Sequence, residues 1–122
     1  MRVLIVDDSS SHRTRLRRFL EELGNDVTEA STGHDAISLY QEVRPDWVAL
    51  DRVMPDMGGM STLEHLRSVD PHVKVVMISS SNTVSELLEA REAGAQAFLL
   101  KPLKREKVEN TLRKLKLLGE GK

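Results

Sequence analysis

The feature that most constrains the fold is the regular alternation of short apolar runs with longer amphipathic segments. Residues 3–6 form a continuous Val-Leu-Ile-Val run, which is typical of a strand buried on both faces. After this run, leucine and phenylalanine recur three and four residues apart up to residue 23, and Gly24 follows. This spacing predicts an amphipathic helix that ends at the glycine. The chain therefore begins with a strand followed by a helix.

The same alternation continues along the chain. Further strands are predicted at residues 26–30, 47–50, 73–78 and 97–100, and further helices at 33–43, 61–69, 84–93 and 104–118. Five strands that alternate with five helices predict an α/β domain with a doubly wound parallel sheet and helices on both faces.

Length and composition limit the organisation of the chain. The 122 residues, 39% of them hydrophobic, suit one domain with one core, which we expect to span residues 1–119 with 120–122 as a short tail and no output domain. The absence of cysteine excludes disulfides and thiolate chemistry. The opening apolar run is far shorter than the ~20 residues of a membrane span, so we expect a cytoplasmic protein with no membrane insertion. A formal net charge of −1 provides no overall field that would attract nucleic acid.

Polar residues stand where four of the predicted strands end. Asp7 and Asp8 follow the first strand, Asp51 the third, Ser79 the fourth and Lys101 the fifth. Because functional side chains of α/β sheets gather at the carboxyl ends of the strands, these five residues should meet at one rim. Each has a structural interpretation when it is taken alone, such as helix capping after the first strand. Their joint occurrence indicates a functional site.

The three aspartates predict a cation site. Carboxylates that are brought together repel one another, and a bound cation normally neutralises them. Hard oxygen ligands suit Mg²⁺, for which Mn²⁺ is expected to substitute. An ionised carboxylate beside such a metal is also a competent nucleophile towards phosphorus, so one of the three can be phosphorylated. Lys101 would add a positive charge and Ser79 a hydroxyl donor for a phosphoryl oxygen.

Four segments resemble the motifs of response-regulator receiver domains. They are VLIVDD at 3–8, LDRVMPDMGG at 50–59, ISS at 78–80 and GAQAFLLKP at 94–102. The resemblance runs from residue 3 into the last predicted helix, and it implies a flavodoxin-like sheet with strand order 2-1-3-4-5. The chain looks most similar to stand-alone, chemotaxis-type receivers, and a phosphorelay intermediate would have the same motifs.

Carried over by position, the resemblance assigns a role to each rim residue. Asp51 becomes the phospho-acceptor, and Asp7, Asp8 and Asp51 become the metal ligands together with the backbone carbonyl of Val53. Lys101 would pair with the phosphoryl group. The partner that supplies the phosphoryl group would be a sensor histidine kinase or a phosphotransfer protein.

The resemblance also implies how phosphorylation is transmitted. Ser79 would be the switch hydroxyl that moves towards the phosphate, and Phe98 the aromatic residue whose rotamer follows it. The surface of the fourth helix, fifth strand and fifth helix would change shape, so that a target protein is bound or released. The protein would act as a monomer and would not be an enzyme, since it would catalyse only its own phosphoryl transfer and dephosphorylation.

Some positions depart from the family pattern. Arg52 stands where many relatives carry an aliphatic residue, and its role is left open. In the family, the positions of Val53 and Ser81 flank the path of the hydrolytic water, and neither residue is a strong base here. We therefore expect slow self-dephosphorylation. The four histidines form no pair at metal-ligand spacing and are expected at the surface.

Two other functions remain open at the level of the sequence. A magnesium-dependent phosphohydrolase of the haloacid-dehalogenase type also phosphorylates a strand-end aspartate, but that family has a second aspartate two residues later, where this chain has Val53. The other alternative is a degenerate receiver that binds partners without phosphorylation. Its candidate surface would be the arginine-rich first helix, which carries Arg13, Arg15, Arg17 and Arg18.

Overall fold

The computed structural model describes residues 1–81 and 83–117, in which strands and helices strictly alternate. The strands are β1 (Arg2–Val6), β2 (Asp26–Ala30), β3 (Trp47–Asp51), β4 (Val75–Ser79) and β5 (Ala97–Leu100). The helices are α1 (Ser10–Glu22), α2 (Gly33–Val43), α3 (Gly58–Val69), α4 (Val84–Glu92) and α5 (Arg105–Lys114). The expected tail at 120–122 and the end of the expected domain lie outside the described residues.

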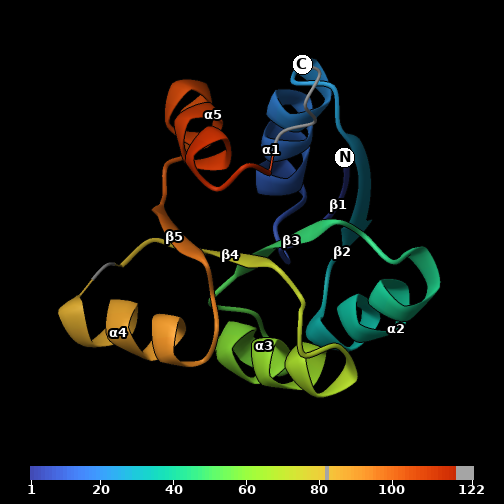
Figure 1. Ribbon diagram of the computed structural model, residues 1–122, viewed down its shortest axis with the longest axis vertical. Helices are drawn as coiled ribbons and strands as arrows, with labels where there is room; N and C mark the ends of the chain where they lie inside the picture. The colour runs from blue at the N-terminus through green and yellow to red at the C-terminus, as the bar shows by residue number, and fades with distance from the viewer. Residues whose placement is uncertain (82, 118–122) are drawn as a thin grey trace.

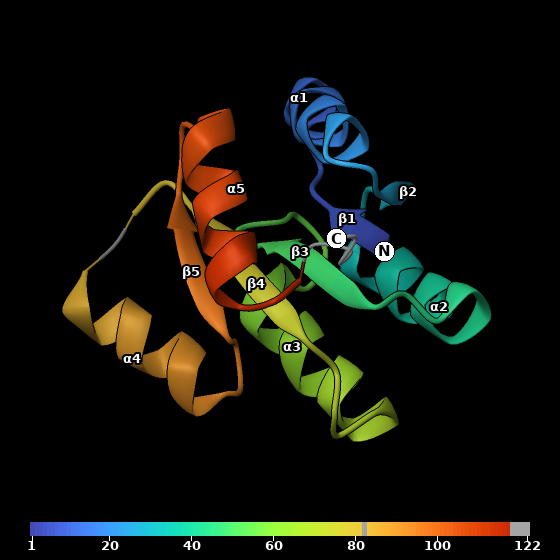
Figure 2. The same ribbon diagram turned by 45° about the horizontal axis from the view of Figure 1, so that its top comes forward.

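All neighbouring strands are parallel, and they form one sheet in the order β2-β1-β3-β4-β5. Helices α1 and α5 cover one face of the sheet, and α2, α3 and α4 cover the other (Figure 1). Figure 2 shows α4 beside β5, at the edge of the sheet opposite to β2. The predicted doubly wound fold and its strand order are confirmed. None of the helices in the described part of the chain is long and apolar enough to cross a membrane.

The alternation of side chains along β1 explains why its apolar run is continuous. Leu4 and Val6 belong to the core layer beneath α2, α3 and α4. Val3 and Ile5 belong to the opposite layer beneath α1 and α5, where Trp47 is also fully buried. Because both faces of the sheet are covered, every position of the strand after Arg2 is buried.

Three predicted boundaries are wrong by two to four residues. Helix α3 begins at Gly58 and not at residue 61, because glycine has low helix propensity and the Gly-Gly start gave no helical signal. Strand β4 begins at Val75 and not at residue 73. Helix α5 ends at Lys114 and not at 118, because Lys116 adopts a left-handed backbone conformation and Leu117 turns back into the core. Residue 118 lies outside the described part.

Asp56 fixes the connection between β3 and α3. Its carboxylate accepts hydrogen bonds from the backbone N–H groups of Gly33 and His34, both at 3.1 Å, and contacts His34 Nδ1 at 2.8 Å. Burial raises the pKa of Asp56, but these donors and the Met57 N–H outweigh it and hold the pKa well below its usual range. The connection is therefore attached to the first turn of α2.

The Asp56→Asn variant is expected to lose about 1 kcal/mol of unfolding free energy at neutral pH, because an amide oxygen accepts weaker hydrogen bonds than a carboxylate. The pKa of Asp56 is lower in the folded chain than in the unfolded chain. Its contribution is therefore complete above the unfolded value of about 4 and is lost as the pH falls towards the folded value. Urea unfolding at a series of pH values measures both effects.

The matched control is Asp35→Asn, which removes an exposed charge from the first turn of α2. We expect it to lose less stability at neutral pH than Asp56→Asn. Equal losses in the two variants, or a loss in Asp56→Asn that does not shrink in acid, would contradict the role assigned to Asp56.

Candidate functional site

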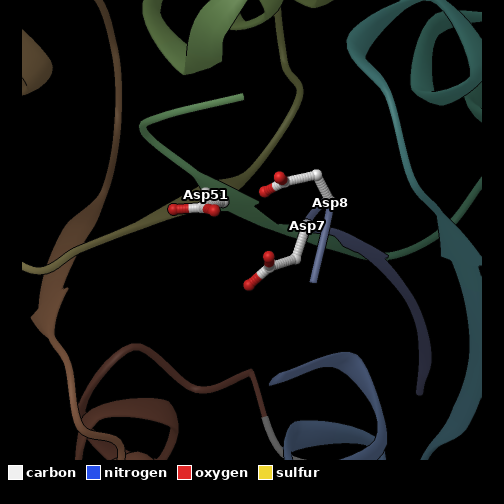
Figure 3. A group of neighbouring side chains, drawn as sticks. All are labelled: Asp7, Asp8 and Asp51. Carbon is white, nitrogen blue, oxygen red and sulfur yellow. The ribbon is translucent and has the colours of Figure 1, made fainter. Parts of the chain in front are cut away.

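Three aspartates from the ends of β1 and β3 meet at the carboxyl rim of the sheet (Figure 3). Asp7 and Asp8 follow β1 directly, and Asp51 is the last residue of β3. One carboxylate oxygen from each lies within 4.8 Å of the others. Asp7 and Asp51 are buried, whereas Asp8 is exposed. The structure thus brings together the three carboxylates that the sequence placed at this rim.

The cluster fits a hard divalent cation by the chemistry of its donors. All three side chains offer carboxylate oxygens, which are the ligands that such cations prefer. Two of the carboxylates come from the protein interior and one from the solvent side. Solvent therefore reaches the cluster at Asp8.

The surroundings of Asp51 disfavour its charge when no cation is bound. Burial raises the pKa of Asp51, and the neighbouring charge of Asp7 raises it further. Lys101 and the backbone N–H of Val53 act in the opposite direction, and the net result is a pKa of about 6. The protein therefore concentrates negative charge here, as a site that is completed by a cation would.

Lys101 supplies the positive charge at the rim. Its Nζ lies 3.2 Å from Asp7 Oδ2 and 3.4 Å from Asp51 Oδ2. A third neighbour is His12 Nδ1 at 3.0 Å, so the three N–H donors of the ammonium face three acceptors. The position of Lys101 is set by β4, because its backbone N–H donates to the Ser79 carbonyl at 2.7 Å.

His12 is a neighbour of the site that the sequence analysis missed. Its ring also lies 3.6 Å from Asp7 Oδ2. The available signal was its place in the first turn of α1, one turn after Asp8, where a side chain can reach the carboxyl end of β1. The general expectation of a surface position is consistent with a side chain that is 53% exposed.

Ser79 and Phe98 lie on neighbouring strands beside the cluster. Ser79 ends β4 and is buried, and its hydroxyl oxygen accepts the Ser81 N–H at 3.1 Å. In β5, Phe98 is level with Met77 and is half-buried against the core layer of α2, α3 and α4. It lines a cavity between α4 and β5 together with Leu87 and other residues. A rotation of this ring would therefore alter the surface beside α4.

Val53 stands two residues after Asp51 in the connection from β3 to α3, with an exposed side chain. The resemblance to receiver domains implied that its backbone carbonyl ligates the metal. That role stays a prediction.

Two arginines of α1 are engaged within the fold. Arg13 Nε lies 2.8 Å from Glu29 of β2, and Arg17 Nη1 lies 2.5 Å from the same carboxylate. Arg13 Nη1 also donates to the Asp7 carbonyl at 2.7 Å. These side chains join α1 to β2, which weakens the case for α1 as the partner-binding surface of a degenerate receiver.

Comparisons with known proteins relate the chain to a single family. The family described as the response regulator receiver domain matches residues 3–113. The chemotaxis protein CheY of Thermotoga maritima is 35% identical over 115 residues, which cover 93% of this chain and 96% of the relative.

Solved structures give the same relation. Vibrio cholerae CheY4 has a TM-score of 0.88 at 29% identity and is matched over 93% of this chain and 96% of that chain. CheY in the CheX-CheY-BeF3-Mg complex from Borrelia burgdorferi has a TM-score of 0.91 at 30% identity. The match covers 94% of this chain and 88% of that chain.

The Asp51→Asn variant is expected to raise the unfolding free energy of the metal-free protein by about 2 kcal/mol at neutral pH, because it removes a disfavoured buried charge. The pKa of Asp51 is about 6 in the folded chain and about 4 in the unfolded chain. The penalty is therefore absent below the unfolded value, grows as the pH rises between the two values, and is complete above the folded value. Urea unfolding in chelator across this range measures it.

Magnesium is expected to reverse this order of stability. Added Mg²⁺ should stabilise the native chain, because only the folded state binds it, and should stabilise Asp51→Asn much less. The comparison variant is Asp8→Asn, whose exposed carboxylate carries a smaller burial penalty. If the metal-free Asp51→Asn variant is less stable than the native chain at neutral pH, the attraction of Lys101 for the Asp51 carboxylate outweighs the cost of burying its charge.

Proposed function

The chain belongs to the response regulator receiver domain family, and we propose that it is a phospho-accepting switch of a two-component or phosphorelay system. The observation that carries the proposal is the meeting of Asp51 with Asp7, Asp8 and Lys101 at one rim of the sheet. Asp51 is the phospho-acceptor in this proposal. Its carboxylate lies next to both a candidate cation site and a lysine ammonium.

We infer that Mg²⁺ is the cation of this site, held by Asp7, Asp8 and Asp51 and by the carbonyl of Val53, with Mn²⁺ as a substitute. When bound, the metal neutralises the carboxylates and the charge that a phosphoryl group brings. The all-oxygen donor set supports this choice.

The ionised carboxylate of Asp51 is the nucleophile. One of its oxygens attacks the phosphorus atom of a phosphohistidine or an acyl phosphate. The new aspartyl O–P bond forms as the bond from phosphorus to the leaving nitrogen or oxygen breaks, and the leaving group takes the electron pair. Because the pKa of Asp51 is about 6, the ionised form predominates at neutral pH. Lys101 stays beside the product and donates to a phosphoryl oxygen.

Ser79 and Phe98 carry the signal to the surface in this proposal. The Ser79 hydroxyl turns towards the phosphoryl group, and the Phe98 ring follows into the space beside β4. The surface that responds is formed by α4, β5 and α5. Its chemistry supports a protein target, because Val84, Leu87 and Leu88 expose apolar side chains on α4.

The partners follow from the same reaction. A sensor histidine kinase or a phosphotransfer protein supplies the phosphoryl group, and the protein then binds or releases a target as a cytoplasmic monomer. It acts only on itself and so is a regulator, not an enzyme with a separate substrate. A chemotaxis-type role is favoured over a phosphorelay intermediate, because the Thermotoga maritima CheY matches over nearly its whole length. Family membership also argues against the phosphohydrolase alternative.

Incubation with acetyl phosphate and Mg²⁺ is expected to add one phosphoryl group to the native chain and none to Asp51→Asn. Intact-mass analysis measures the adduct. Excess chelator should suppress it, and Asp8→Asn or Asp7→Asn should need a higher Mg²⁺ concentration for the same yield, because each removes one carboxylate ligand. Lys101→Ala should slow the reaction.

Asp46→Asn, in the connection before β3, is the matched control and should be modified as fast as the native chain. An adduct of equal yield on Asp51→Asn would show that the acceptor is another residue. No adduct on the folded native chain with several donors would favour a receiver that binds partners without phosphorylation.

The Ser79→Ala variant is expected to accept the phosphoryl group but to lose the response of Phe98, because the hydroxyl that follows the phosphate is missing. The ring resonances of Phe98, recorded by NMR with and without beryllofluoride and Mg²⁺, measure that response. Ser68→Ala, an exposed change on α3, should respond as the native chain does. An unchanged Phe98 response in Ser79→Ala would remove Ser79 from the switch.

A further inference from the structure

Arg52, the residue after the proposed acceptor, has a backbone that is fixed from two sides. Its N–H donates to the Ile78 carbonyl at 2.8 Å, and its own carbonyl accepts the Gly59 N–H at 2.7 Å. A Cβ added to Gly59 would lie 2.4 Å from the Asp51 carbonyl oxygen and 2.6 Å from Arg52 Cα. The start of α3 therefore packs directly against this backbone, and the Arg52 side chain extends from a fixed point.

The guanidinium of Arg52 pairs with Glu86 in the first turn of α4. Arg52 Nη1 lies 3.1 Å from Glu86 Oε2, and the two side chains are only 25% and 18% exposed. The other carboxylate oxygen, Oε1, accepts the Ser81 hydroxyl at 2.8 Å and the Thr83 N–H at 3.3 Å. The hydrogen bond from Ser81 is the main cause that lowers the pKa of Glu86, and Arg52 acts in the same direction. The ion pair thus joins the end of β3 to Ser81 and Thr83.

Ser81 connects this ion pair to the proposed switch hydroxyl. Its backbone N–H donates to Ser79 Oγ at 3.1 Å. A continuous path of polar contacts therefore runs from Arg52 through Glu86 and Ser81 to Ser79. The path begins beside the acceptor on β3 and ends on the neighbouring strand β4. A hydroxyl that turned towards a phosphoryl group on Asp51 would move relative to the Ser81 N–H.

We propose that Arg52 is a positioning residue for the Ser79 hydroxyl, acting through Glu86 and Ser81. The Arg52–Glu86 ion pair holds Ser81 against Ser79 and so stabilises the arrangement without a phosphoryl group. Weakening the pair shifts the equilibrium towards the arrangement in which Ser79 contacts the phosphoryl group. This inference rests on the proposed function of Asp51 as the acceptor, and it assigns a role to the arginine that departs from the family pattern.

Simple charge effects predict a different result, which makes the proposal testable. Loss of the positive charge of Arg52 would by itself weaken the binding of an anion at Asp51, whereas loss of the negative charge of Glu86 would strengthen it. Under the positioning role, both changes strengthen binding, because each breaks the same ion pair. The sign of the effect at Arg52 therefore separates the two explanations.

The experiment titrates beryllofluoride with Mg²⁺, the phosphoryl mimic and metal of the Borrelia burgdorferi CheY complex, into the native chain, Arg52→Leu and Glu86→Gln. Glutamine retains the acceptor oxygen of the helix cap and removes only the charge. Partly exposed ion pairs are weak, so we expect each variant to bind about two- to fivefold more tightly. The double variant should gain no more than either single variant, because both break one interaction.

A second readout reports the position of Ser81 before any ligand is added. In the ligand-free variants, the NMR signal of the Ser81 amide should lie between its positions in the native chain without and with beryllofluoride. Such an intermediate position is expected when a two-state equilibrium is shifted. Arg52→Lys retains a charge and should lie between Arg52→Leu and the native chain. Arg105→Leu, which breaks the exposed pair of Arg105 with Glu22 at 3.2 Å, is the matched control and should change neither readout.

Several results would overturn the proposal. Unchanged or weaker binding by Arg52→Leu, or additive effects in the double variant, would show that Arg52 does not act through Glu86. If Arg52→Leu fails to fold, an unmoved Ser81 signal in Glu86→Gln leads to the same conclusion. Failure of the native chain to bind the mimic and to accept a phosphoryl group would overturn the proposed function together with this inference. Binding by the native chain with no effect of the variants overturns the positioning role alone.

Discussion

The contact of Asp7 and Asp51 with the ammonium of Lys101 is the interaction on which the rest of the rim depends. Two buried carboxylates repel each other in a poorly hydrated place, and one lysine shared between them offsets only part of that repulsion. The repulsion that Lys101 does not offset favours the binding of a cation between the carboxylates. In the proposed function it also gives the site its chemistry, since a carboxylate kept next to positive charge is suited to receive and hold a phosphoryl group.

The parallel sheet makes this arrangement possible, and the connections after the strands keep it in place. Asp7 follows β1, Asp51 ends β3 and Lys101 follows β5, so only the strand order brings them together. Asp56 ties the connection after β3 to α2, and Gly59 lets α3 begin directly against the same backbone. The backbone after Asp51 is therefore held by contacts with α2 and α3, whereas Ser79 and Ser81 make their contacts through polar side chains, which can exchange partners.

The sequence was sufficient for the sheet and for the charged cluster, because both follow from regular patterns. Continuous apolar runs predicted the buried strands, and polar residues at their ends predicted the rim. The contacts of Arg52 with Glu86 and of His12 with Lys101 could not be predicted, since they join elements that are distant in the sequence and depend on side-chain rotamers. The start of α3 was missed for a different reason: glycine carries no helical signal, and the backbone contact of Gly59 with the Arg52 carbonyl at this point joins two separate segments of the rim.

Chemical mapping of the phosphorylated residue would identify the acceptor directly. Borohydride reduces an aspartyl phosphate to homoserine, so treatment of the native chain after incubation with acetyl phosphate and Mg²⁺ marks the acceptor in a peptide map. We expect homoserine at position 51 alone, and none when chelator replaces Mg²⁺. Homoserine at position 7 or 8 would show that another aspartate is the acceptor, and equal conversion without the metal would remove Mg²⁺ from the reaction.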